Sequence, residues 1–272
     1  MRPIRGWGTV VLVAAAATAS SCGVFETADF RASRHIEIPH VAGSAIAVRT
    51  ENGEVTIATG SGPSVVIEAD VFATTKERLT QTKVTAVRDS KNALSIGIEW
   101  PDARKPTEGC AFHVTLPDAN GVRVECSNGL VEVRGAAIVG VANLTTSNGD
   151  VRVDTHSESV IAHSSNGRVT VKGPHRTVEA ESSNGDVEAA VLEGPAKVRT
   201  SNGRVTLSIG EAFQGPIDVE TSNGSIEARG LEGKPGVTVE RPSKRKARIV
   251  VGSGGEPSSV HSSNGDVEIE RK

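Results

Sequence analysis

A short phrase recurs along this chain: Ser-Asn-Gly, one variable residue, and then a segment in which apolar and polar residues alternate. Complete copies begin at positions 127, 147, 165, 183, 201, 222 and 263, and Asn52-Gly53 belongs to a weaker copy. The asparagines lie at positions 128, 148, 166, 184, 202, 223 and 264, so the steps between them are 20, 18, 18, 18, 21 and 41. A repeat of about 20 residues predicts a stack of equivalent coils, each contacting its neighbours.

The last step, from position 223 to position 264, is about twice an ordinary step. Its middle falls at Ser243-Lys244, where the repeat would place an Asn-Gly corner. We therefore expect one divergent coil there, with its corner formed by Arg241-Pro242-Ser243-Lys244. On this interpretation the coils stack in the order in which they occur in the sequence.

One repeat contains two strands and two corners. Asn184-Gly185 forms a corner, residues 186–191 alternate, Gly194-Pro195 forms a second corner, and residues 197–200 alternate again. Asn-Gly between alternating strands is also a strong hairpin signal, which leaves an antiparallel meander as the alternative. A meander would carry equivalent turns at both ends, whereas here only one corner is constant. The pattern favours an all-β fold, a single-domain parallel β-solenoid (β-helix) with about 18–21 residues per coil.

Equivalent residues on adjacent coils should lie about 4.8 Å apart and form ladders. The structural corners are expected at Asn52, Gly53, Asn128, Gly129, Asn148, Gly149, Asn166, Gly167, Asn184, Gly185, Asn202, Gly203, Asn223, Gly224, Asn264 and Gly265, where glycine accepts positive φ. The residue after each glycine gives a charge ladder of Asp150, Arg168, Asp186 and Arg204. Opposite charges on neighbouring coils favour this register over a slip by one coil. The hydroxyls two residues before each asparagine, with Cys126 in the same place, should also align.

The composition of the chain also agrees with a stack of thin coils. Among 272 residues there are no Tyr, five Phe and two Trp, and the net charge of -3 gives no reason to expect nucleic-acid binding. Residues 46–48, 55–57, 65–69 and 94–98 are expected to be strands, residues 75–80 a short helix, and residues 100–109 an exposed loop. We assign 36–272 to the β-solenoid, with irregular coils over 36–121 and regular Ser-Asn-Gly coils over 122–272.

The first residues have the features of an export signal. Arg2 and Arg5 precede a short apolar run, and Ala19-Ser20-Ser21 leads into Cys22. Small residues followed by Cys resemble a bacterial lipobox, which implies cleavage after residue 21 and lipidation of Cys22. The alternative is an ordinary secretory signal with a free cysteine nearby. We expect residues 1–21 to be a lipoprotein signal peptide, residues 22–35 the lipidated Cys and tether, and the protein to be anchored at the outer face of a bacterial membrane.

Two further cysteines remain, Cys110 and Cys126. An even number of cysteines in an exported chain suggests a disulfide, and positions 110 and 126 are slightly less than one coil apart. That spacing predicts neighbouring coils and a bond between Cys110 and Cys126. Two buried thiols that fill core space are the alternative.

No residue set with the spacing of a catalytic or metal site is found in the sequence. His163 and His261 should face outward about five coils apart, too far for one metal ion, although His156 and His163 could approach each other on one coil. No Gly-x-Ser-x-Gly motif is present. We expect no enzyme activity, no cofactor and no metal.

The phrases SSNGDVEI and TSNGRVTL, together with residues 43–55, resemble the bacterial "putative adhesin" repeat family. The resemblance covers about residues 36–272 and implies a β-solenoid of unknown function in exported or membrane-attached proteins. It implies a non-enzymatic, lipid-anchored surface of the cell envelope, structural or adhesin-like, with a glycan or a protein as possible ligand and the membrane as partner. The alternative function is a carbohydrate-active β-helix enzyme of the polysaccharide lyase or hydrolase type.

Overall fold

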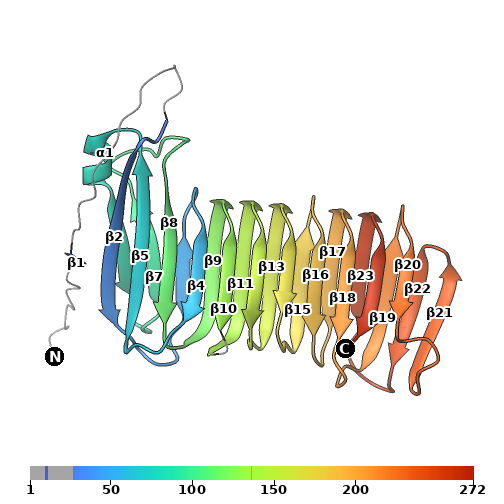
Figure 1. Cartoon of the computed structure of the whole chain (residues 1–272). Coiled ribbons are helices and arrows are strands. Elements are labelled where there is room, and N and C mark those ends of the chain that lie inside the picture. Colours follow the sequence, from blue (N-terminus) through green and yellow to red (C-terminus); the bar gives the residue numbers. More distant parts are fainter. Residues whose placement is uncertain (1–9, 12–26, 136) are drawn as a thin grey trace.

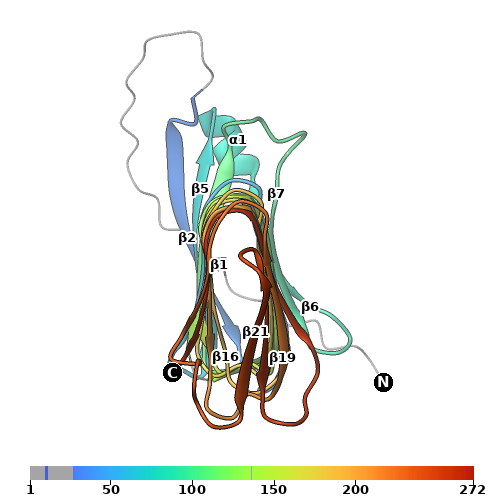
Figure 2. The same ribbon diagram turned by 90° about the vertical axis from the view of Figure 1, so that its right-hand side faces the viewer.

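The computed structural model describes residues 10–11, 27–135 and 137–272. Its strands form two 12-stranded sheets that face each other along an elongated stack (Figure 1). Seen along the stack, the coils superpose as a narrow flattened ring with one sheet on each long side (Figure 2). The fold is therefore the β-solenoid that the repeat predicts, with one strand per sheet in each regular coil.

The first sheet, sheet A, has the spatial order β1 (Val10–Val11), β2 (Phe30–Pro39), β5 (Ser64–Ala73), β8 (Gly109–Leu116), β4 (Val55–Thr59), β10 (Val131–Gly135), β12 (Val151–Thr155), β14 (Val169–Lys172), β16 (Val187–Val191), β18 (Val205–Ile209), β24 (Val267–Arg271) and β20 (Ile226–Arg229). The second, sheet B, has the order β21 (Val237–Ser243), β22 (Lys246–Val251), β19 (Gly215–Thr221), β23 (Ser258–Asn264), β17 (Ala196–Asn202), β15 (Thr177–Ser182), β13 (Ser159–Asn166), β11 (Ile138–Asn148), β9 (Ala119–Asn128), β3 (Ile46–Arg49), β7 (Leu94–Glu99) and β6 (Lys83–Arg88). The short helix α1 spans Lys76–Gln81.

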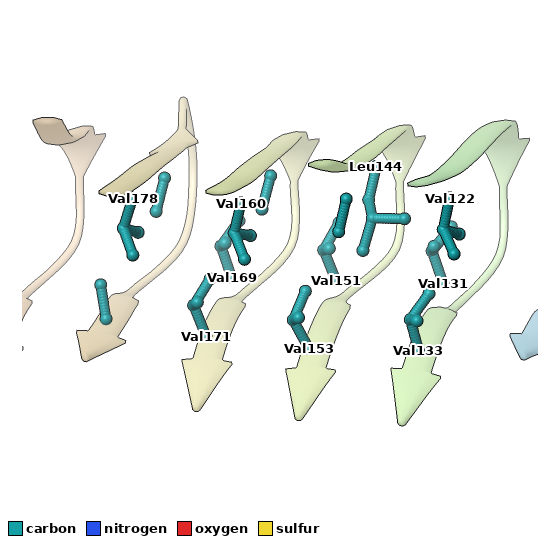
Figure 3. Close-up of a cluster of buried hydrophobic side chains, with 14 of the residues drawn as sticks. Val122, Val131, Val133, Leu144, Val151, Val153, Val160, Val169, Val171 and Val178 are labelled. Carbon is teal, nitrogen blue, oxygen red and sulfur yellow. The ribbon is translucent and has the colours of Figure 1, made fainter. Parts of the chain in front are cut away.

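Small branched residues fill the space between the sheets. In sheet A, Val131 pairs with Val151, and Val151 with Val169, in a register that repeats from coil to coil. All three side chains are fully buried and form one row of the core, which Figure 3 shows. Val, Ile and Ala make up most of this core, with Phe112 and Phe213 as its buried aromatic residues, in keeping with the aromatic-poor composition.

The coils do not stack in sequence order. β23 lies between β17 and β19, and β24 lies between β18 and β20, so the coil at 258–271 is inserted between two coils that precede it in the chain. Near the other end, the coil of β3 and β4 lies between β7/β8 and β9/β10. The expected sequential order is therefore wrong at both ends of the stack.

The prediction of a divergent coil around Ser243-Lys244 is also wrong. β21 and β22 form an antiparallel hairpin in which Ser243 pairs with Lys246, and β22 then pairs antiparallel with β19. Antiparallel strands close the opposite end as well, where β2 pairs with β5 and β5 with β8. Antiparallel pairing thus replaces parallel stacking in sheet B at the C-terminal end and in sheet A at the N-terminal end, whereas β20, the last strand of sheet A, pairs in parallel with β24.

The strands expected at 46–48, 55–57, 65–69 and 94–98 are β3, β4, β5 and β7, and the expected helix is α1, which begins after the capping residue Thr75. β2 begins at Phe30, so part of the expected tether is a strand. Cys22 and the expected signal segment, apart from β1, lie outside the described residues. No helix in the described part of the chain is both long and apolar enough to span a bilayer.

The expected disulfide between Cys110 and Cys126 is absent, and both residues are free and buried. The coil of β3 and β4 lies between them: Thr50 Oγ1 donates to the Cys110 carbonyl at 2.8 Å, and Cys126 Sγ lies 3.3 Å from the Gly53 carbonyl. Two coil spacings are about 9.6 Å, beyond the roughly 4.4–6.8 Å between Cα atoms that a disulfide allows. Burial raises the pKa of both thiols, so they act as small core residues.

The loop between β7 and β8 is not wholly exposed, because it carries the fully buried Glu108. This carboxylate accepts hydrogen bonds from Arg78 Nε at 2.7 Å, the Lys105 N–H at 3.0 Å and the Thr74 N–H at 3.1 Å. Burial alone would raise the pKa of Glu108, but the bonds from Arg78, Lys105 and Thr74 outweigh it and hold the pKa at about 2. Glu108 therefore fastens the loop to α1 and β5.

We expect Glu108→Gln to destabilise the chain at neutral pH by about 2 kcal/mol, since an amide N–H₂ then meets donors that the carboxylate satisfied. The stabilisation by Glu108 is complete above the unfolded pKa near 4.5 and is lost as the pH falls to about 2. The difference between variant and parent in urea unfolding should shrink over that window. A difference that stays constant from pH 7 to pH 2.5 would contradict this account.

We expect Gly185→Ala to loosen the stack. A Cβ at Gly185 would lie 2.2 Å from the carbonyl oxygen of Gly167 on the neighbouring coil, so the backbones must separate. The expected loss is roughly 2–3 kcal/mol in urea unfolding. Gly62→Ala is the control, because no atom lies within 4 Å of a Cβ built there. Equal stability of the two variants would show that close coil contact does not require glycine.

Candidate functional site

The Ser-Asn-Gly corners form one edge of the solenoid, where the chain passes from sheet B to sheet A. The asparagine side chains of neighbouring coils are joined by hydrogen bonds of 2.7–2.9 Å from Nδ2 of one to Oδ1 of the next. This amide ladder runs in the spatial order Asn52, Asn128, Asn148, Asn166, Asn184, Asn202, Asn264 and Asn223. At its first member, Asn52 Nδ2 donates to the carbonyl oxygens of Pro106 and Glu108.

A second row lies just inside the amide ladder. From Asn148 onward, the hydroxyl two residues before each asparagine donates to the glycine carbonyl of the neighbouring coil, as in Ser164 to Gly149 and Ser182 to Gly167, both at 2.8 Å. The glycines are required because the carbonyl oxygen of one coil lies where a Cβ on the glycine of the next coil would be. The sequence suggested left-handed backbone as the reason. Positive φ is found at Gly53, Gly129 and Gly149, with values of 128°, 151° and 157°, whereas φ at Gly185 lies outside that region and close approach of the neighbouring coil requires glycine there.

The charged row after the glycines lies on the sheet A side of the same corner. Asp150, Arg168, Asp186 and Arg204 fall on successive coils, and Asp266 of the inserted coil comes next. Arg168 and Asp186 are 3.5 Å apart, and Arg204 and Asp266 are 4.0 Å apart. Asp186 Oδ1 also accepts from the Arg204 backbone N–H at 2.9 Å. Asp186 therefore binds the preceding coil through the charge of Arg168 and the next coil through the backbone of Arg204.

A groove of about 430 Å³ lies on the outer face of sheet B, beside the amide ladder. One row of its lining consists of the outward side chains three residues before the asparagines, namely His163, Glu181, Arg199 and His261. The other consists of the serines immediately before the asparagines, Ser147, Ser165, Ser183, Ser201 and Ser263. The register sets these residues on adjacent strands, so His163 and His261 are three strands apart, not the five coils expected from the sequence.

One end of the groove holds a compact ionic cluster. Lys197 Nζ lies 2.6 Å from Glu179 Oε1 and 2.8 Å from Glu181 Oε1, and His163 Nε2 lies 3.9 Å from Glu179. Burial works to raise the pKa of Glu181, but Lys197 outweighs it and the pKa is lowered; bonds to Glu179 and Glu181 raise the pKa of Lys197. His163, Glu179 and Glu181 have the donor atoms of a metal site. The Lys197 ammonium already supplies a positive charge there, so a metal ion would have to displace it.

The groove also contains one serine–histidine contact. His261 Nε2 lies 3.3 Å from Ser263 Oγ. A nucleophilic serine needs a histidine that a third group orients. The neighbouring carboxylate, Glu220, forms an ion pair with Lys246 at 3.0 Å, and the described residues show no hydrogen bond that orients His261. His261 and Ser263 therefore offer polar groups for contact with a ligand, without the arrangement that a nucleophilic serine needs.

The remaining histidines lie away from the groove. His175 is buried at the opposite corner, where its ring nitrogens contact Ser157 Oγ at 3.2 Å and the Lys172 carbonyl at 2.8 Å. His156 lies in the loop before β13, and His163 lies near the other end of that strand, so the two do not form a pair.

Both the coil geometry and the continuous amide ladder define a β-solenoid assembled from Ser-Asn-Gly repeats. The sequence profile of the Toastrack DUF4097 family matches residues 18–270, and the chain belongs to this family. No curated protein matches the chain in sequence.

The chain is also similar to several crystal structures. One, described as a putative adhesin from Bacteroides fragilis, is 14% identical with a TM-score of 0.44, over 89% of this chain and 97% of that one. A putative cell adhesion protein from Clostridium sporogenes is 10% identical with a TM-score of 0.37, over 89% and 100% of the two chains. Likeness at this level carries no information about ligand or activity.

Proposed function

We propose that this chain is a non-enzymatic, adhesin-like binding surface of the cell envelope, and that its contact site is the groove on the outer face of sheet B. The observation that carries the proposal is the combination of two rows along this groove, one of hydroxyls and one of ionic side chains, on a rigid sheet. A rigid, repeating surface loses little conformational entropy when it binds an extended ligand.

Arg199 is the residue that we expect to contribute most to binding. It lines the groove between Glu181 and His261, and within the described residues it has no ion-pair partner. Its planar guanidinium presents donors that match carboxylate or neighbouring hydroxyl groups. Such a ligand would be a hydroxyl-rich or acidic polymer, as envelope glycans are, or an acidic segment of a protein.

The alternative of a carbohydrate-active enzyme requires an acid and a base or nucleophile set apart at the scissile bond. Glu179 and Glu181 are the acidic pair beside the groove, and one carboxylate oxygen of each forms an ion pair with the Lys197 ammonium. A lowered pKa at Glu181 disfavours the protonated form that a general acid needs. These features favour binding over cleavage.

The binding test uses residues 23–272 against immobilised envelope glycans and matrix proteins. Arg199→Ala should weaken binding to the best ligand by about tenfold or more, because a charge-assisted hydrogen bond is lost. The matched control is Arg152→Ala on the outer face of sheet A, where the arginine is similarly exposed. Equal effects of the two variants, or product release from an intact glycan, would contradict the proposal.

We further propose that Cys22 carries the lipid that holds the protein at the membrane. Cys22→Ser should move the protein from the membrane fraction to the soluble exported fraction, because several acyl chains on one cysteine are needed for stable anchoring. Fractionation and the mass of the mature N-terminal peptide provide the measurement. Unchanged fractionation, with no lipid mass on the parent protein, would refute it.

A further inference from the structure

The inserted coil, residues 258–271, occupies a seat formed by segments that precede it in the chain. Figure 1 shows β23 and β24, in dark red, between the β17/β18 coil and the β19/β20 coil. β23 pairs in parallel with β17 on one side and β19 on the other, and β24 with β18 and β20. Without the inserted coil, these neighbours would stand two coil spacings apart, about 9.6 Å.

The inserted coil is bound on both sides by the same contacts that join the regular coils. Asn264 donates to Asn202 and accepts from Asn223, each at 2.9 Å, so the amide ladder passes through it. Val260, Val267 and Ile269 are buried in the common core. The seat is thus completed only by a segment with this repeat.

Polar contacts specific to this segment also fix it. Ser258 Oγ accepts from the Ala196 N–H at 2.9 Å, and Glu270 accepts from Ser208 Oγ at 2.6 Å. Glu268 forms an ion pair with Arg229 at 2.8 Å. Asp266 supplies the negative charge that follows Arg204 in the charged row. These contacts select residues 258–271 over other coils of the chain.

The inserted coil is joined to the preceding strand by residues 252–257, Gly-Ser-Gly-Gly-Glu-Pro, all of which are exposed. Glycine and serine favour a flexible connection, and six extended residues span about 20 Å. None of the contacts that hold the coil in its seat depends on which chain supplies it. An element with these properties is the kind that exchanges between copies.

We propose that the seat between β17/β18 and β19/β20 is an interaction site for a second copy of this chain, which donates its own inserted coil through the 252–257 hinge. Each copy then completes the stack of the other, and exchanged and unexchanged forms contain the same contacts at the seat. Protein concentration during folding decides between them, because closure within one chain competes with capture of another chain's coil.

The test uses full-length chains in which Cys22, Cys110 and Cys126 are replaced by Ser, Ala and Thr. Ser201 and Ser263 are neighbours across β17 and β23, between the paired positions 200/262 and 202/264. One chain carries Ser201→Cys and the other Ser263→Cys. The two are mixed, unfolded, refolded together at several concentrations and oxidised. A disulfide between position 201 of one chain and position 263 of the other, identified by peptide mapping, is favoured where the inserted coil of one copy occupies the seat of the other. Linkage by random collision of exposed cysteines is the background that the control measures.

The matched control is the pair Ser147→Cys and Ser165→Cys, which are neighbours across β11 and β13 in the middle of the stack. A third chain with both Ser201→Cys and Ser263→Cys shows that the disulfide can form in one molecule. We expect several-fold more linked dimer from the 201/263 mixture than from the 147/165 mixture, rising with concentration. Equal yields, or no dimer while the third chain closes its internal disulfide, would overturn the proposal.

Discussion

The contact of one backbone corner with the next is the interaction on which the rest of this structure depends. At the Ser-Asn-Gly corners from Asn148 onward, a glycine carbonyl accepts a hydrogen bond from the hydroxyl of the neighbouring coil and also lies where a Cβ on that coil's glycine would be. A hydrogen bond and a steric exclusion thus act at the same point. Because they recur once per coil, a corner fixes the register of both sheets, and the valines on either side of it stack as a consequence.

Much of this follows from the sequence, because the corner is local. Asn184-Gly185 and the alternation that follows specify a turn and a strand without reference to any distant residue. The order of the coils is different. Residues 182–188 and 262–268 have the same sequence, SSNGDVE, so the repeat itself does not determine which coil stacks on which. The decision rests on contacts between distant residues, such as Glu268 with Arg229, that no spacing reveals.

The incorrect disulfide prediction has the same origin. The sequence spacing of Cys110 and Cys126 places them on adjacent coils only if the chain stacks in sequence order, and the coil of β3 and β4 lies between them. The groove was partly predictable, since the repeat identifies its outward residues. The cluster of His163, Glu179 and Lys197 was not, because it joins residues at two different repeat positions on three neighbouring strands.

The regularity that stabilises the solenoid also creates a problem of specificity. Any coil end presents unpaired strands that fit another Ser-Asn-Gly coil, so growth has to stop at defined places. In sheet B, an antiparallel hairpin ends the growth of the stack. In sheet A, Arg241 donates to the Ile226 carbonyl at the edge of β20 and so occupies one of its unpaired acceptors. Inside the stack no such protection exists, and only the sequence of the charged row and its neighbours selects one coil over another. The seat of the inserted coil has to satisfy both requirements. It must be open while the chain folds, and it must then be filled by one particular segment.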